Sequence, residues 1–227
     1  VHLNNSDEII SLDKDGDIYY AFLPSYAEND ITYFSTDSGN TVYVDGKKYV
    51  EEDNLDGISF NNVHNLIIKN AFGFSVCKEK IILMKSANIS TLSISLNDTI
   101  IEKIENDKTV KKSGAISVIN GKGEINYSGA LKAIHSRGNA SWNSPKKPYT
   151  LEFENEVNLL NMGAGKKWVL LANAYDATNM KNKIVLEAAQ ELGVRFCSSS
   201  EFVDLYINGE YRGLYLLAEK IDRKSVV

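Results

Sequence analysis

The stretch AIHSRGNASWNSPKKPYTLE, residues 133–152, is the part of the chain that decides its architecture. Arg137 and Gly138 open a short polar segment, and Lys146 and Lys147 stand between two prolines just before a strand-like run. Glycine permits tight turns and close approach of a ligand to the backbone, while Arg and Lys bind phosphate or carboxylate groups. The stretch therefore predicts an anion-binding turn that leads into a β-strand.

The composition is that of an ordinary globular protein. Of the 227 residues, 43% are hydrophobic and 24% are charged, which argues against disorder. This length allows one large domain or two small ones. A formal net charge of -5 gives no general attraction to nucleic acid or to anionic membranes, and no apolar run is long enough to cross a bilayer. We therefore expect no nucleic-acid partner and no membrane span.

The N-terminal part of the chain predicts a β-sandwich. Short alternating runs are separated by turn residues between positions 7 and 85, and Asp45-Gly46 is a strong signal for a two-residue hairpin. Strands at this spacing are typical of an immunoglobulin-like sandwich. A polar joint near residue 86 marks a change in composition, so we expect an Ig-like domain over residues 1–86 and a second domain over residues 87–227. The predicted fold class is mainly β with an α+β part.

The second part contains one clear helix and a hairpin. Apolar residues recur at helical spacing between positions 184 and 192, and Gly193 ends the helix. Asp176 or Thr178 provides its N-terminal cap. Asn208-Gly209 then predicts a second hairpin turn. The order of strand, glycine turn, lysine-bearing strand, helix and hairpin is that of the small lobe of protein kinases, although many α+β domains share it.

The motifs in this part are more specific than their order. They are Arg137-Gly138-Asn139 with Ser141-Trp142, Pro145-Lys146-Lys147-Pro148-Tyr149, Trp168-Val169-Leu170-Leu171-Ala172-Asn173, Asp176-Ala177-Thr178, Lys181-Asn182, the run from Phe202 to Tyr211, and Gly213 to Ile221. Together they resemble the CotH family, the spore-coat protein H kinases, over roughly residues 90 to 222. The resemblance implies an atypical kinase-like fold of which this chain holds the N-terminal, nucleotide-binding part. It also implies transfer of the γ-phosphate of ATP, with Mg²⁺, to Ser or Thr of spore-coat or secreted proteins.

Several residues are candidates for the nucleotide site, each with a simpler alternative. Lys147, or in second place Lys146, is the candidate to contact phosphate, and the alternative is a solvated lysine pair. Arg137 either binds phosphate or pairs with an acidic neighbour. Glu187 on the helix either pairs with the strand lysine or faces outward.

The end of the hairpin adds a further candidate. The segment Glu219, Lys220 and Ile221 either offers backbone groups to adenine or is an ordinary strand end. In the CotH family, the catalytic and metal-binding carboxylates lie C-terminal to the segment that corresponds to these three residues. We therefore predict no catalytic or metal-binding residue within this chain, and expect the 227-residue polypeptide alone to lack phosphotransferase activity.

Two other functions stay open. The chain is alternatively a non-catalytic extracellular or coat module whose N-terminal domain recognises a protein or a cell-wall carbohydrate. It is otherwise a purely structural extracellular protein. For all three functions, the expected location is the spore coat, the extracellular space or the bacterial cell surface.

Overall fold

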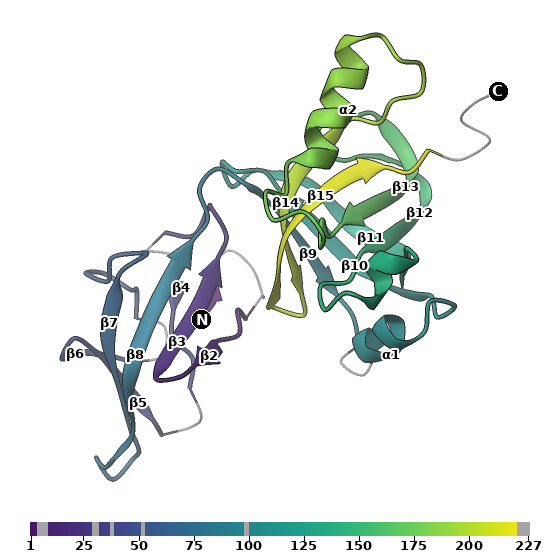
Figure 1. Cartoon of the computed structure of the whole chain (residues 1–227). Helices are drawn as coiled ribbons and strands as arrows, with labels where there is room; N and C mark the ends of the chain where they lie inside the picture. Colours follow the sequence, from purple (N-terminus) through teal and green to yellow (C-terminus); the bar gives the residue numbers. More distant parts are fainter. Residues whose placement is uncertain (4–8, 29–31, 37–38, 51–52, 98–99, 222–227) are drawn as a thin grey trace. The chain divides into compact units, whose positions relative to one another are not determined.

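The computed structural model describes residues 1–3, 9–28, 32–36, 39–50, 53–97 and 100–221. The chain divides into two compact units, and each is described by itself. The first comprises Val1–Asn88 with Gly209–Tyr211, and the second comprises Ile89–Asn208 with Arg212–Val227. Both are built mainly from strands, so the prediction of a mainly β fold is confirmed (Figure 1).

The first unit is one mixed sheet with a small ladder beside it. The six-stranded sheet has the order β2-β3-β8-β7-β5-β6, and β1 pairs with β4. The strand bounds are β1 His2–Leu3, β2 Asp13–Asp15, β3 Ile18–Leu23, β4 Thr32–Tyr33, β5 Thr41–Val44, β6 Lys47–Tyr49, β7 Val63–Lys69 and β8 Ser75–Lys85. This topology leaves the immunoglobulin-like arrangement a prediction.

The side chains of this sheet alternate between a buried face and an open face. Ala21, Leu66, Ile81 and Leu83 are buried on one face, whereas Val63 on the other face is 58% exposed. Strand alternation produces this pattern, since successive side chains point to opposite sides of a sheet. One face of the sheet therefore carries the core of the unit.

The Asp45-Gly46 hairpin forms as predicted, and His64 fixes it. Asp45 and Gly46 both have positive φ, at 47° and 84°. His64 Nδ1 lies 2.7 Å from the Asp45 carboxylate, and its Nε2 lies 2.8 Å from the Ser59 carbonyl oxygen. Because both ring nitrogens face acceptors, the doubly protonated imidazolium satisfies both contacts. Burial works against this charge, but the contacts to Asp45 and Ser59 outweigh it and raise the pKa of His64 above its ordinary 6.5.

This arrangement predicts a pH dependence of stability. A raised pKa in the folded state means that the stabilisation by His64 is fully present below pH 6.5 and is lost as the pH rises through the folded pKa. We expect the first unit to lose about 1 kcal/mol of unfolding free energy between weakly acidic and weakly basic solution. Urea unfolding across this range measures the loss. His64→Gln should abolish the dependence, and an unchanged slope in that variant would contradict the assignment to His64.

The second unit is a closed barrel with the strand order β10-β11-β12-β13-β15-β14-β9. Its elements are β9 Ser90–Ser95, α1 Ile100–Asn106, β10 Lys112–Ile119, β11 Ile125–Ser136, the short 3₁₀ helix η1 Ala140–Asn143, β12 Tyr149–Asn158, β13 Ala164–Leu171, α2 Lys181–Glu191, β14 Ser200–Ile207 and β15 Glu210–Glu219. Neighbouring strands are antiparallel except β9 and β14, whose parallel pairing closes the barrel. Figure 1 shows these strands, coloured teal to yellow, around a common interior.

The barrel interior is filled by large apolar side chains. Trp168, Tyr149, Tyr215 and Leu92 are among the fully buried ones. Trp168 therefore belongs to the barrel core, whereas Trp142 is only half-buried. Helix α2 forms where the apolar spacing predicts it and ends at Gly193, whose φ is 67°. Within the described ranges, neither helix has the length or the apolar character to cross a membrane.

Candidate functional site

A pocket of about 260 Å³ lies in the second unit, where β13 leads into α2. Its walls come from the end of β11, the η1 turn, the β13–α2 connection and the first residues of α2. The lining residues are Arg137, Ser141, Pro148, Leu171, Ala172, Asn173, Ala174, Tyr175, Asp176, Lys181 and Asn182. Residues 133–152, through Arg137, Ser141 and Pro148, therefore supply one wall of the pocket.

Arg137 is the most distinctive of these side chains. Its backbone N–H donates to the Pro148 carbonyl at 3.0 Å, which anchors the residue at the mouth of β12. Among the residues that the structure describes, its half-buried guanidinium has no hydrogen-bond or ion-pair partner. Burial lowers the pKa of Arg137, because desolvation penalises its charged form. A desolvated cation without a carboxylate beside it gains most from an anionic ligand.

The turn beside Arg137 is fixed by contacts from several elements. Gly138 has a φ of 87°, a conformation that favours glycine, and Lys108 donates to its carbonyl oxygen at 3.0 Å. Tyr175 donates its hydroxyl to the Ala140 carbonyl at 2.8 Å. The glycine-containing turn predicted from the sequence thus forms one wall of the pocket, and hydrogen bonds from Lys108 and Tyr175 fix its position.

The opposite wall is ordered by its own polar side chains. Asn173, with a φ of 49°, donates to the Asn179 carbonyl at 3.0 Å and accepts from the Asn182 amide at 2.7 Å. Asp176 accepts from the backbone N–H of Lys181, the first residue of α2, at 2.8 Å, so its carboxylate satisfies a first-turn amide as predicted, although the N-cap position itself is Met180. Hydrogen bonds from Thr178 and Lys181 lower the pKa of this carboxyl. The connection therefore holds the N-terminus of α2 at the pocket.

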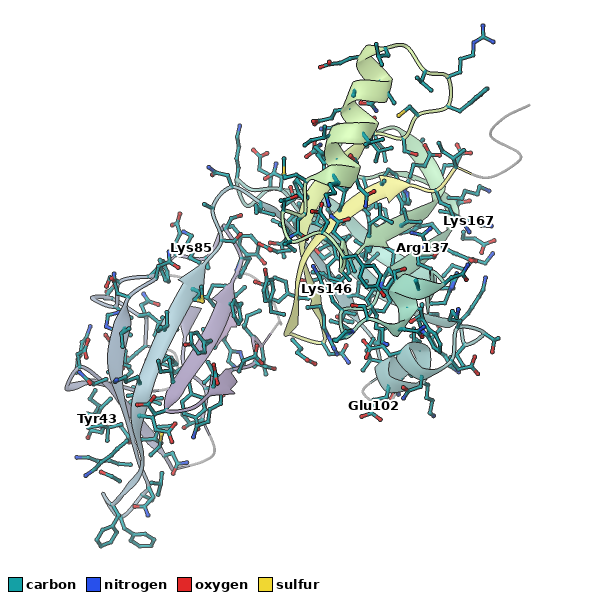
Figure 2. The ribbon with its side chains drawn as sticks, viewed as in Figure 1. Tyr43, Lys85, Glu102, Arg137, Lys146 and Lys167 are labelled. Carbon is teal, nitrogen blue, oxygen red and sulfur yellow. The ribbon has the colours of Figure 1, made fainter. Side chains whose placement is uncertain are left out.

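The two candidate lysines lie outside the pocket lining. Lys147 donates to the Trp142 carbonyl at 2.7 Å and lies 5.5 Å from the centre of that indole ring. Lys146 donates to the Leu214 carbonyl and lies 4.6 Å from the ring centre of Tyr215 (Figure 2). Burial lowers the pKa of Lys146, against an opposing effect of the Asp204 charge. Both ammonium groups thus bind backbone carbonyls: Lys146 ties the turn to β15, and Lys147 holds the turn together from within.

Glu187 and the end of β15 are also engaged locally. Glu187 is 3.2 Å from Lys183, one helical turn away, and is not brought to Lys147. The Glu219 carbonyl accepts from the Ser198 hydroxyl at 2.8 Å, and the Lys220 N–H donates to the Lys167 carbonyl at 2.8 Å. Ile221 is 41% exposed. Of the predicted site residues, only Arg137 therefore lines the pocket.

The pocket also contains residues that the sequence reasoning did not select. Asn173, Lys181 and Asn182 were recognised as parts of motifs but not as lining residues. The signal for them was a polar run directly before a capped helix, since such a run places amides and a helix N-terminus at one point. Within the described ranges, no group of three or more His, Cys, Asp or Glu side chains could hold a metal ion.

Comparison with protein families agrees with the motif analysis. None of the curated proteins compared with the chain matches it. A family model described as CotH kinase protein matches residues 134–227, which is less than half of the chain. The matched segment begins within β11 and includes Arg137, the η1 turn and α2. The resemblance to the CotH family is thus confirmed, and residues 134–227 are the segment of this chain that matches the CotH kinase family.

Proposed function

We propose that the pocket beside α2 receives the phosphates of a nucleotide in a CotH-type protein kinase. The observation that carries the proposal is the half-buried guanidinium of Arg137, which lines the pocket and has no partner among the described residues. Guanidinium groups bind phosphate through paired hydrogen bonds. The N-terminus of α2 contributes a positive dipole end, and Lys181 adds a second cation at the rim.

The reaction that fits this site is transfer of the γ-phosphate of ATP to Ser or Thr of a spore-coat or secreted protein. Arg137 and the α2 N-terminus would hold phosphate oxygens and stabilise the charge that builds up on them. Mg²⁺ would neutralise the β- and γ-phosphates when bound. Asp176 is the one carboxylate in the lining, and both of its oxygens already accept hydrogen bonds. We therefore propose that this chain binds nucleotide without itself supplying the acids for transfer.

Calorimetric titration of the 227-residue chain with ATP and Mg²⁺ tests the proposal. Arg137→Gln is expected to weaken ATP binding by about 10- to 100-fold, the usual worth of a hydrogen bond to a charged group. Binding of adenosine should change little in that variant, because adenosine has no phosphate. Arg195→Gln, on the exposed α2–β14 connection, is the matched control and should bind ATP as the unchanged chain does.

The same titration separates the rival roles of the lysines. If Lys147 or Lys146 contacts phosphate, as the sequence predicts, Lys→Gln at that position should weaken ATP binding without changing adenosine binding. If the lysine only ties the turn to the Trp142 or Leu214 carbonyl, the substitution should lower stability and affect both ligands alike. Equal ATP affinities for the unchanged chain and Arg137→Gln, or no ATP binding at all, would reject the phosphate site.

A further inference from the structure

The turn between β7 and β8 exposes two aromatic rings to solvent. Phe72 is 86% exposed and Phe74 is 72% exposed, and Val76, the next residue but one on β8, is 59% exposed. Figure 1 shows this turn projecting beyond the ends of the neighbouring strands of its sheet. These side chains contribute nothing to the core, and clusters of exposed apolar side chains are typical of surfaces that meet a partner.

The turn that carries these rings is held by four hydrogen bonds. The Asn70 side-chain oxygen accepts from the backbone N–H groups of Phe72 and Phe74, at 3.1 and 3.0 Å. Two backbone bonds complete it, from Asn70 to the Phe74 carbonyl and from Gly73 to the Asn70 carbonyl, both at 2.9 Å. Gly73 has a φ of 82°, which favours glycine. The backbone that presents the rings is therefore ordered before any partner is met.

A second turn in the same chain shows that the turn itself does not need aromatic residues. Between β10 and β11, the Asn120 side-chain oxygen accepts from the N–H groups of Lys122 and Glu124, at 2.9 and 3.0 Å. The same two backbone bonds recur, and Gly123 has a φ of 84°. Lys122 and Glu124 thus occupy the positions of Phe72 and Phe74. The fold of the turn therefore does not require phenylalanine at positions 72 and 74.

The strands below the rings are basic. No Asp or Glu occurs between positions 57 and 78, although the chain as a whole is acidic. Lys69 is the last residue of β7, directly before the turn, and its ammonium lies 4.7 Å from the ring centre of Tyr43. In the sheet, Lys78 on β8 lies opposite Ile67 on β7, and Ile67 lies opposite Tyr43 on β5. Lys78 is four residues beyond Phe74, or about 13 Å along an extended strand.

We propose that the β7–β8 turn inserts into a lipid surface that contains anionic headgroups. The rings of Phe72 and Phe74 enter the boundary between headgroups and acyl chains, where apolar side chains gain free energy. Lys69 and Lys78 extend along the strands to the lipid phosphates, as long cationic side chains do at membrane interfaces. An exposed apolar turn with lysines behind it suits a bilayer, because a bilayer takes up apolar side chains without a complementary pocket. This site does not depend on the proposed nucleotide pocket.

Flotation of the 227-residue chain with lipid vesicles tests the site. The chain should float with vesicles of phosphatidylcholine and phosphatidylglycerol, and less with phosphatidylcholine alone. Phe72→Lys with Phe74→Glu copies the side chains of the β10–β11 turn, so the fold should be kept while the partition coefficient falls about 100-fold. Lys69→Gln with Lys78→Gln should lower it about 20-fold on the anionic vesicles and hardly at all on the neutral ones.

A composition-matched variant provides the decisive control. Combining Phe72→Lys and Phe74→Glu with Lys122→Phe and Glu124→Phe moves the two rings to the other turn without changing composition or net charge. We expect this variant not to float. The proposal is overturned if the unchanged chain floats with neither vesicle, or if the swapped variant floats equally well. It is likewise overturned if the phenylalanine variants abolish self-association in sedimentation experiments while vesicle binding is absent.

Discussion

Trp168→Ala is expected to lower the free energy of unfolding of the barrel by about 3–5 kcal/mol. Trp168 is fully buried on β13, within the cluster that fills the barrel interior. Its indole N–H donates to the Gly165 carbonyl at 3.1 Å. The substitution leaves a cavity and also removes the donor to that carbonyl, so packing and hydrogen bonding are lost together. Chemical unfolding followed by circular dichroism measures the loss.

Trp142 provides the matched control for this substitution. Its ring is half-buried, and the ammonium groups of Lys108 and Lys147 lie 4.7 and 5.5 Å from the ring centre. Trp142→Ala removes these cation–ring contacts but opens no cavity in the barrel, so about 1–2 kcal/mol is expected. Equal losses for the two tryptophans would contradict the assignment of Trp168 to the barrel core.

Gly114→Ala is expected to cost about 2–4 kcal/mol, although it adds only a methyl group. A Cβ at this position of β10 would lie 2.5 Å from the Ser95 carbonyl oxygen and 2.6 Å from a Leu96 methyl carbon. The Ser95 oxygen belongs to the backbone of the adjacent strand β9, so relief requires the two strands to move apart. Such a movement disturbs the closure of the barrel. Unfolding midpoints and amide hydrogen exchange in β9 report it.

Gly129→Ala on the neighbouring strand β11 is the control. It shows whether the loss at Gly114 comes from the clash with the β9 backbone or from replacing any strand glycine by alanine. A Cβ at Gly129 would lie 2.8 Å from the hydroxyl of Tyr127, which is the far end of a side chain and not part of a neighbouring strand's backbone. We expect less than half the loss found for Gly114→Ala. A larger loss at Gly129 would show that the β9–β10 contact is not what makes Gly114 necessary.

The features that local chemistry dictates were predictable from the sequence. The turns at Asp45-Gly46 and Asn208-Gly209 form because these residues adopt positive φ readily, and all four do so. Helix α2 begins where the Asp176 carboxylate accepts from the Lys181 N–H, and it ends just before Gly193, for equally local reasons. The closed barrel was not predicted, because its last pairing joins β9 to β14, strands that are distant in sequence and parallel.

The candidate site was predictable only in part, for the same reason. Arg137 was selected from its motif, and it lines the pocket. The direction of a lysine side chain depends on which carbonyls and rings the fold brings near it, and a spacing pattern does not contain this information. Lys146 and Lys147 meet the Leu214 and Trp142 carbonyls. Their proposed contact with phosphate stays a prediction.

The parallel pairing of β9 with β14 has a consequence for how the protein is made. Ser90 pairs with Val203, so a ribosome must synthesise nearly the whole barrel before β9 finds its second neighbour. The antiparallel run from β10 to β13 joins strands that follow one another in sequence and can form early, whereas the closing contact must overcome the entropy of a much longer loop. Until then β9 presents an unpaired edge with the apolar residues Leu92 and Ile94 beside it. Late closure of this pairing therefore leaves an apolar strand edge open to other chains for most of the synthesis of the barrel.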